Sequence, residues 1–207
     1  MKILIYGDSN TFGWMPNLNG YSKDVMVERY NKNDIWWSAL AKGNELIVNG
    51  CPGRAIANDS PWLVGRNATK TMKKDFDGIS VDIAIFQLGT NDCKSQYALS
   101  ANEIAEYMKV FAQKAKKMLG EPVVVVISPA KIVEGNKITD KYYVGAQKKS
   151  TRLDECYKKM CSKNGFSFVS GLDLETGEDG EHLTKEAHKM LGNRVLEKIS
   201  KICKKEK

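Results

Sequence analysis

Ser9 and His182 are the two residues of this sequence best suited to chemistry. Ser9 lies in segment 7–11 (Gly-Asp-Ser-Asn-Thr), directly after an apolar run. A serine hydroxyl is a weak nucleophile unless a neighbouring base accepts its proton and a third group orients that base. The chain has two histidines; His182 lies in a polar loop, whereas His188 falls inside a predicted helix. Ser9 and His182 therefore predict an acyl-transfer site built on a serine nucleophile.

Three acidic side chains near His182 could orient its imidazole ring. Asp179 is best placed, because the glycine-containing loop lets its carboxylate reach the Nδ1–H and leaves Nε2 free to face a serine. Glu181 and Asp173 are poorer candidates for the same role. We therefore expect Asp179 to hold the His182 ring toward Ser9.

Three hydrogen-bond donors could stabilise the oxyanion that forms on an attacked carbonyl. Asn91 follows a predicted strand, and its side-chain amide can donate. Gly53 follows another predicted strand and permits a close backbone approach with a free N–H. The N–H of Ser9, at the start of a helical turn, is the third donor. These residues predict an oxyanion hole.

Each of these segments has an ordinary structural explanation when it is taken alone. Segments 7–9 and 89–92 have common turn sequences, and a loop histidine is usually just solvated. The four segments nevertheless follow three different predicted strands or precede the last predicted helix. These places can converge at one edge of a sheet, and that coincidence favours a catalytic site.

The elements that must position these residues alternate along the chain. Short apolar runs predict five strands, at 3–6, 45–48, 83–88, 123–127 and 166–169. Helical spacing predicts five helices, at 35–42, 68–76, 101–119, 146–163 and 185–203. Parallel strands need long crossover connections, so the alternation predicts an α/β protein, a three-layer α/β/α sandwich with a five-stranded parallel sheet. Ser100 and Glu103 predict a capping box at the start of the third helix. In such sheets, ligands bind beyond the carboxyl ends of the strands.

Length and composition favour one soluble domain over residues 1–207, because 207 residues with 42% hydrophobic content can bury a core and no repeat or linker interrupts them. The longest clearly apolar run, 123–127, is far shorter than the roughly 20 residues needed to cross a bilayer. Five cysteines without a Cys-x-x-Cys spacing, and no signal-like start, predict a reduced cytoplasmic protein. With two histidines and no cysteine pair at ligand spacing, we expect no metal and no other cofactor.

The net charge of +7 raises the question of a nucleic-acid partner. Only five of the 32 basic residues are arginines, the residue better suited to bidentate contacts with phosphates and bases. The lysines recur inside helical patterns, as solvated helix faces do. We expect a small-molecule ester as the partner, with no nucleic acid and no membrane; the oligomeric state, a homo-oligomer included, stays open.

The quoted segments resemble the SGNH hydrolases, also called the GDSL esterase/lipase family. The Ser, Gly, Asn and His blocks of this family are matched in order by Ser9, Gly53, Asn91 and His182. The first block departs from the family pattern, since Asn10 stands where leucine is usual. The third block and the last, Asp-x-x-His at 179–182, match without departures. The similarity runs from residue 3 to residue 182.

The resemblance implies a flavodoxin-like sandwich in which Ser9 is the nucleophile, His182 the general base and then acid, and Asp179 its orienting partner. The oxyanion hole would consist of the N–H groups of Ser9 and Gly53 and the Asn91 amide. Within the family, segment 7–16 looks most like small arylesterases that also catalyse acyl transfer, and segments 28–30 and 89–94 fit the same subgroup. A serine esterase for short-chain acyl esters is therefore expected, with water or an alcohol as acyl acceptor.

Three further residues are candidates for substrate binding. Trp14 and Tyr21, in the irregular stretch 12–34, could line an acyl or alcohol pocket or pack onto the body of the protein. Arg54, next to Gly53, could bind an acidic group on the substrate, although pairing with a nearby carboxylate is the favoured interpretation.

Other functions remain open at this stage. The same catalytic residues would serve a carbohydrate O-acetyl esterase or a thioesterase. A non-catalytic α/β binding module could retain the turn residues. A receiver-like or phosphoryl-transfer protein could use Asp8 and Asp92 to bind magnesium. An α/β-hydrolase is excluded because no Gly-x-Ser-x-Gly nucleophile elbow occurs.

Overall fold

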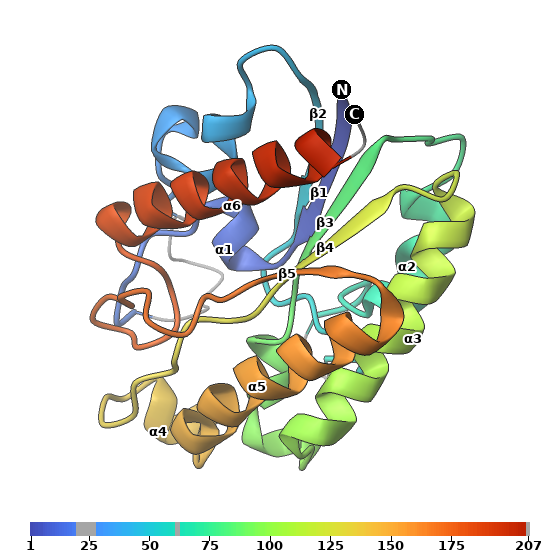
Figure 1. The fold of residues 1–207 in the computed structure, drawn as a ribbon. Helices are drawn as coiled ribbons and strands as arrows, with labels where there is room; N and C mark the ends of the chain where they lie inside the picture. The colour runs from blue at the N-terminus through green and yellow to red at the C-terminus, as the bar shows by residue number, and fades with distance from the viewer. Residues whose placement is uncertain (20–27, 61–62, 206–207) are drawn as a thin grey trace.

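A five-stranded parallel sheet forms the centre of the molecule (Figure 1). The structure is a computed structural model that describes residues 1–19, 28–60 and 63–205. The strands, in the spatial order β2-β1-β3-β4-β5, are β1 (Lys2–Gly7), β2 (Glu45–Gly50), β3 (Ile83–Gln87), β4 (Val123–Ile127) and β5 (Ser167–Val169). All four pairings are parallel. The predicted sheet is confirmed, with strand ends that differ from the prediction by at most two residues.

The helices follow the predicted alternation with additions. They are α1 (Ser9–Phe12), α2 (Ala68–Asp75), α3 (Ala101–Met118), α4 (Thr139–Tyr142), α5 (Ala146–Asn164) and α6 (Lys185–Lys205), with short 3₁₀ helices η1 (Lys32–Asp34), η2 (Trp36–Leu40), η3 (Asn91–Cys93) and η4 (Ser95–Tyr97). The capping box of α3 is present, since Ser100 Oγ accepts from Glu103 N and Ser100 N donates to Glu103 Oε2. No helix in the described part of the chain is both apolar and long enough to span a bilayer.

The prediction of an α-helix over 35–42 is wrong, because this segment contains only η2. Its two tryptophans are buried, and each indole N–H is committed to a distant acceptor. Trp36 Nε1 donates to Gln87 Oε1 at 2.9 Å, and Trp37 Nε1 donates to the Thr11 carbonyl at 2.9 Å. These tertiary bonds fix a tighter turn than the helical spacing predicted.

Helices cover both faces of the sheet. Alternation along the strands sends neighbouring side chains to opposite faces: Leu4 and Tyr6 join one apolar cluster, and Ile3 and Ile5 join the other. The first cluster includes residues of α2, α3 and α5, and the second includes residues of η2 and α6. Figure 1 shows α6 and the pair α3 and α5 on opposite sides of the strands. The three-layer sandwich is therefore confirmed.

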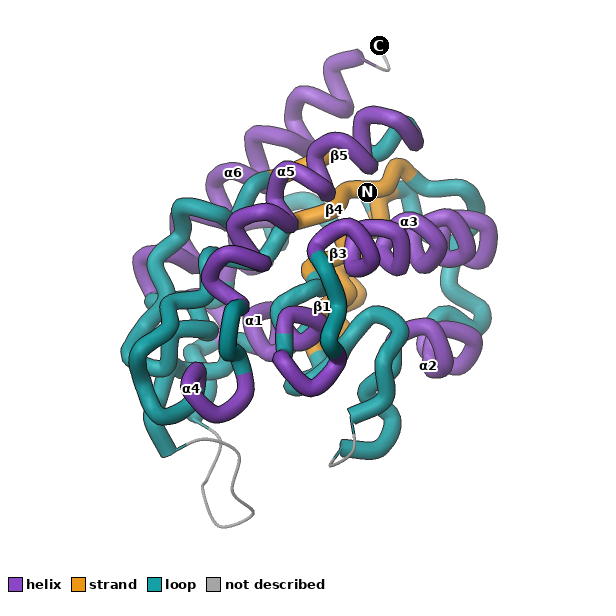
Figure 2. The backbone as a smooth tube through the Cα atoms, turned by 90° about the horizontal axis from the view of Figure 1, so that it is seen from below, coloured by secondary structure: helices purple, strands orange, loops and turns teal. Residues whose placement is uncertain are grey.

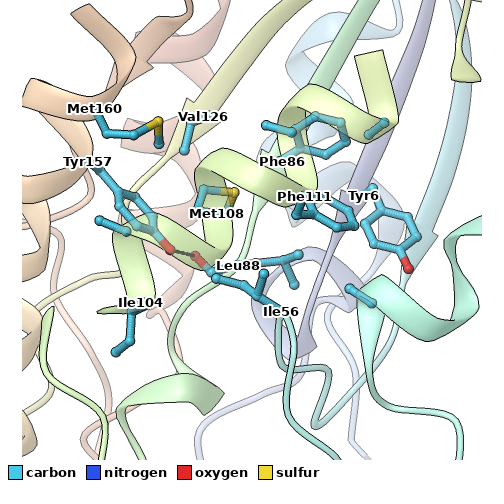
Figure 3. Packing of buried hydrophobic residues seen from close by; sticks show 14 of the residues in the cluster. Tyr6, Ile56, Phe86, Leu88, Ile104, Met108, Phe111, Val126, Tyr157 and Met160 are labelled. Carbon is cyan, nitrogen blue, oxygen red and sulfur yellow. Dashed lines mark hydrogen bonds between the residues drawn. The ribbon is translucent and has the colours of Figure 1, made fainter. Parts of the chain in front are cut away.

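Aromatic rings fill the face under α3. The Phe111 ring lies 5.2 Å from the Phe86 ring and 5.8 Å from the Tyr6 ring, measured between centroids, so it joins β3 to β1 (Figure 3). Phe111 is fully buried. Removing such a ring costs about 3–5 kcal/mol in a core, so this packing fixes the strand ends that carry the polar loops.

The paired strands finish at one edge. Gly7, the last residue of β1, is in register with Gly50 on β2 and with Gln87 on β3. Loops and the short helices α1 and α4 lie together at this end of the molecule, which Figure 2 shows from below. The segments that contain Ser9, Gly53 and Asn91 start here, as the parallel topology requires.

Candidate active site

Ser9 is held in a tight turn between β1 and α1. The Asp8 carboxylate caps α1 by accepting from Asn10 N at 2.9 Å, and Ser9 is the first residue of the helix. Gly7 is required before it, because a Cβ there would lie 2.1 Å from Thr11 Oγ1. Ser9 is 1% exposed, and its hydroxyl has a hydrogen-bond partner, since Ser9 Oγ lies 2.9 Å from His182 Nε2.

His182 reaches Ser9 from a loop 173 positions later in the chain. Its other ring nitrogen, Nδ1, lies 2.7 Å from Asp179 Oδ2. The backbone N–H groups of His182 and Glu181 donate to Asp179 Oδ1 at 3.0 and 3.1 Å, and Asn17 N donates to Oδ2 at 3.0 Å. The carboxylate is thus fixed by its own loop and by Asn17 N, and the Ser9–His182–Asp179 chain of hydrogen bonds is continuous.

The two poorer carboxylate candidates are engaged elsewhere. Asp173 forms a bidentate pair with Arg194, at 2.6 and 2.7 Å. Glu181 accepts a hydrogen bond from the Tyr143 hydroxyl and is buried. Asp179 is therefore the residue that the structure brings to the His182 ring.

Burial and charge act in opposite directions on this pair. Burial alone would raise the pKa of Asp179, but the hydrogen bonds from His182 and Glu181 and the charge of the imidazole outweigh it, so the pKa lies below its usual value. Burial alone would lower the pKa of His182, but the charges of Glu181 and Asp179 and the hydrogen bond to Asp179 raise it above 6.5. The site therefore stabilises a protonated imidazole beside an ionised carboxylate.

The three predicted oxyanion donors lie on the Ser9 turn and on the loops that follow β2 and β3. In the part of the chain that the structure describes, the N–H groups of Ser9 and Gly53 have no acceptor. Gly53 has φ +78°, a backbone conformation that favours glycine. Asn91 Nδ2 donates one hydrogen to the Arg54 carbonyl at 3.1 Å, which leaves its second N–H available. The Asn91 amide is thereby tied to the residue after Gly53.

Arg54 pairs with a nearby carboxylate, as the favoured interpretation of the sequence expects, and its contact with substrate stays a prediction. Its guanidinium donates to the carbonyls of Gly7 and Asn49 at 2.8 and 2.7 Å and lies 3.7 Å from Asp75 Oδ2. It also stacks over the Tyr6 ring, 3.9 Å from the centroid. The side chain is buried, and its terminal nitrogens join the loop after β2 to the ends of β1 and β2.

Trp14 packs against the base. Its ring lies parallel to the His182 ring at 13°, with centroids 5.7 Å apart, and it is largely buried. This contact was not predicted, since it depends on a loop and a residue far apart in sequence. Tyr21, the other aromatic candidate, lies outside the described residues.

The structure does not support the alternative in which Asp8 and Asp92 bind magnesium in a receiver-like or phosphoryl-transfer protein. Burial raises the pKa of Asp8 to about 6 and that of Asp92 to about 7. Asp8 caps α1, and both oxygens of Asp92 face the Ile56 N–H at 3.0 and 3.1 Å. Among the described residues, no cluster of three or more His, Cys, Asp or Glu side chains is arranged to hold a metal ion.

His188 also has a purely structural place. It is fully buried on α6, where its Nδ1 accepts from Trp36 N at 3.4 Å, and burial lowers its pKa to about 4. A neutral, buried imidazole of this kind supports packing and is separate from the Ser9 site.

The model of the GDSL-like lipase/acylhydrolase family matches residues 5–190 of this sequence. The chain belongs to this family. A comparison with curated proteins finds no match. The GDSL-family match runs from the second half of β1 into the start of α6, and thus includes every residue of the Ser9–His182–Asp179 chain.

Two solved structures are similar to this GDSL-family chain over almost their full length. A carbohydrate acetylesterase from Sinorhizobium meliloti is 25% identical, with a TM-score of 0.86 over 97% of this chain and 99% of that one. An aryl esterase from M. smegmatis is also 25% identical, with a TM-score of 0.87 over 97% and 98% of the two chains. Family and fold together identify a carboxylic-ester hydrolase.

Proposed function

We propose that this protein is a serine esterase that hydrolyses short-chain acyl esters through an acyl-enzyme on Ser9. The observation that carries the proposal is the Ser9–His182–Asp179 chain, with distances of 2.9 and 2.7 Å between buried side chains from opposite ends of the sequence. Both distances lie within the range required for proton transfer by a general base and its orienting group.

The geometry supports a two-step reaction. Ser9 Oγ attacks the ester carbonyl while its proton passes to His182 Nε2, and Asp179 stabilises the imidazolium that forms. The N–H groups of Ser9 and Gly53 and the Asn91 amide donate to the oxyanion. His182 then gives the proton to the leaving alcohol. In the second step His182 accepts a proton from water, or from another alcohol, as that oxygen attacks the acyl-enzyme. The bond between the acyl carbon and Ser9 Oγ then breaks, and His182 returns the proton to Ser9 Oγ as the acid or the new ester leaves.

A small acyl group suits this nucleophile best. Ser9 is almost fully buried, and the Trp14 and His182 rings stack beside it. The similar carbohydrate acetylesterase also favours an acetyl group on a carbohydrate, and the similar aryl esterase favours an aryl alcohol. A carbohydrate O-acetyl ester is therefore the second candidate substrate, and a thioester would use the same residues.

The test combines a nucleophile variant with a substrate panel. We expect Ser9→Ala to reduce kcat on an aryl acetate by at least about 10⁴-fold, because the variant lacks the attacking oxygen. Its unfolding midpoint should stay close to that of the parent. A serine-directed organophosphonate should add one label, located on Ser9 by peptide mass spectrometry. Ser200→Ala, at an exposed serine on α6, is the matched control and should keep full activity.

The panel separates the candidate substrates. Aryl acetate, aryl octanoate, an acetylated xylo-oligosaccharide and acetyl thioester are compared by kcat/KM, with and without added alcohol. Preference for octanoate would contradict the short-chain assignment. Full activity of Ser9→Ala would reject an acyl-enzyme on Ser9. Failure of the organophosphonate to label the parent would favour a non-catalytic module.

A further inference from the structure

Asn10 holds the loop that contains His182, although it is the one residue at which the first block departs from the family pattern. Its Nδ2 donates to the Glu181 carbonyl at 3.2 Å, and its Oδ1 accepts from Leu183 N at 2.9 Å. These two partners are the residues immediately before and after His182. Asn10 is 3% exposed, so both bonds are sheltered from water.

The two bonds constrain the loop in a way that one bond could not. A primary amide offers a donor and an acceptor in one plane, which matches a backbone C=O and a backbone N–H. Binding on both sides of His182 therefore fixes the direction of segment 181–183 as well as its distance from the Ser9 turn. Asn10 is itself fixed, because its backbone N–H donates to Asp8 Oδ1 at 2.9 Å.

The bonds inside the His182 loop have a different role. Asp179 Oδ1 accepts from the N–H groups of Glu181 and His182, which shapes the loop internally. Those bonds would move with the loop if it shifted as a unit. The Asn10 amide instead joins the loop to the residue next to the nucleophile, across 171 and 173 positions of sequence.

We propose that Asn10 is a positioning residue that keeps His182 Nε2 within proton-transfer reach of Ser9 Oγ. The inference rests on the proposed function. Leucine, the usual residue of the family pattern, has no atom that could make either bond, so this chain uses its unusual residue to align its base. With leucine at position 10, the Glu181 carbonyl and the Leu183 N–H would be left buried without hydrogen-bond partners.

The test measures alignment and catalysis separately. For Asn10→Leu we expect kcat on an aryl acetate to fall about 10²-fold, as a misplacement of the order of 1 Å causes, with KM changed less than about threefold. Amide hydrogen exchange of Leu183, followed by NMR, should accelerate by about tenfold or more, because the acceptor of that N–H is gone. The NMR signals of the His188 ring serve as an internal reference and should not shift in the variant, because this histidine is separate from the Ser9 site.

A second variant isolates one bond and covers the case in which Asn10→Leu does not fold. Asn10→Asp retains the shape and the acceptor for Leu183 N–H but replaces the donor to the Glu181 carbonyl with an oxygen. At pH 8 we expect slow Leu183 exchange together with a kcat reduced by about tenfold or more, since that bond would contribute about 1.4 kcal/mol. A kcat for Asn10→Asp equal to that of the parent would overturn the proposal.

The matched control is Asn164→Leu. The Asn164 amide also uses both ends, donating to the Met160 carbonyl at 2.8 Å and accepting from Gln113 Nε2 at 3.0 Å, but it joins α5 to α3 at the opposite end of the sheet. We expect lower stability with an unchanged kcat. If Asn164→Leu loses kcat as Asn10→Leu does, or if Asn10→Leu keeps kcat within about threefold of the parent, positioning by Asn10 is rejected.

Failure of the proposed function would look different. If the parent and Asn164→Leu turn over no ester, the esterase assignment falls by itself. Leu183 exchange still decides the inference about Asn10 in that case: faster exchange in Asn10→Leu supports the link to the His182 loop, and unchanged exchange overturns it.

Discussion

At the residue scale, the Glu181 carboxylate influences the pKa of the general base His182. Glu181 does not bind the His182 ring, yet its charge raises the pKa of His182 at least as strongly as the hydrogen bond to Asp179. Glu181 is itself buried and accepts from the Tyr143 hydroxyl. Because a general base works only when it is neutral, ester turnover should fall as the pH drops through a His182 pKa that lies above 6.5.

Glu181→Gln should therefore move the acid limb of the pH profile to lower pH. The amide keeps an oxygen for the Tyr143 hydroxyl but removes the negative charge that favours the imidazolium. The measurement is kcat/KM on an aryl acetate from pH 5 to pH 9. Glu178→Gln, at an exposed residue of the same loop, is the control. An identical midpoint in Glu181→Gln and the parent would contradict the electrostatic role.

At the element scale, the apolar runs predicted the sheet well because parallel strands buried on both faces leave a strong signal. The four long helices were predicted for a similar reason. The helical turn that starts at Ser9 was expected, but the four-residue helix α4 was missed, since one turn has no periodicity. Segment 35–42 was misread because the bonds of Trp36 and Trp37 decide its shape. The meeting of Ser9 with His182 was predictable from residue types at strand ends. The bonds of Asn10 were not, because they depend on tertiary placement.

The contact between α1 and β2 gives a second prediction. A Cβ on Gly50 would lie 2.4 Å from the backbone nitrogen of Phe12, so α1 rests directly on the end of β2. Gly50→Ala should lower the free energy of unfolding by about 1–3 kcal/mol. It should also reduce kcat, because α1 begins with Ser9.

Denaturant unfolding and aryl acetate turnover measure both effects. The comparison variant is Gly43→Ala, where no atom lies within 4 Å but φ is +76°. It should lose about 1 kcal/mol of stability through backbone strain and keep its kcat. Equal kcat in Gly50→Ala and the parent would show that α1 can move away from β2 without displacing the nucleophile.

Across the whole molecule, buried ionisable groups make stability depend on pH in two opposing ways. His188, on the α6 side of the sheet, has a pKa lowered by burial to about 4. Between pH 6.5 and 4 the unfolded chain therefore binds a proton that the folded chain does not, and stability falls as the pH falls. Asp8 and Asp92, whose pKa values are raised, oppose this trend because folding favours their protonated forms.

His188→Gln isolates the first contribution, because Asp8 and Asp92 are present in both proteins and cancel in the difference. Relative to the parent, the variant should gain up to roughly 3 kcal/mol on going from pH 7 to pH 4. The glutamine oxygen can still accept from Trp36 N. Urea unfolding at several pH values provides the measurement. A difference between the two proteins that does not change with pH would mean that the pKa of His188 is the same in the folded and the unfolded chain.

Ser9 and His182 are 173 positions apart in the sequence, and this separation has a consequence during biosynthesis. At about 5–20 residues per second, a ribosome adds the histidine roughly 10–35 s after the serine. Throughout that interval the nascent polypeptide has a nucleophile without its base. Ester cleavage should therefore begin only once the histidine has been added and its loop has docked beside the serine.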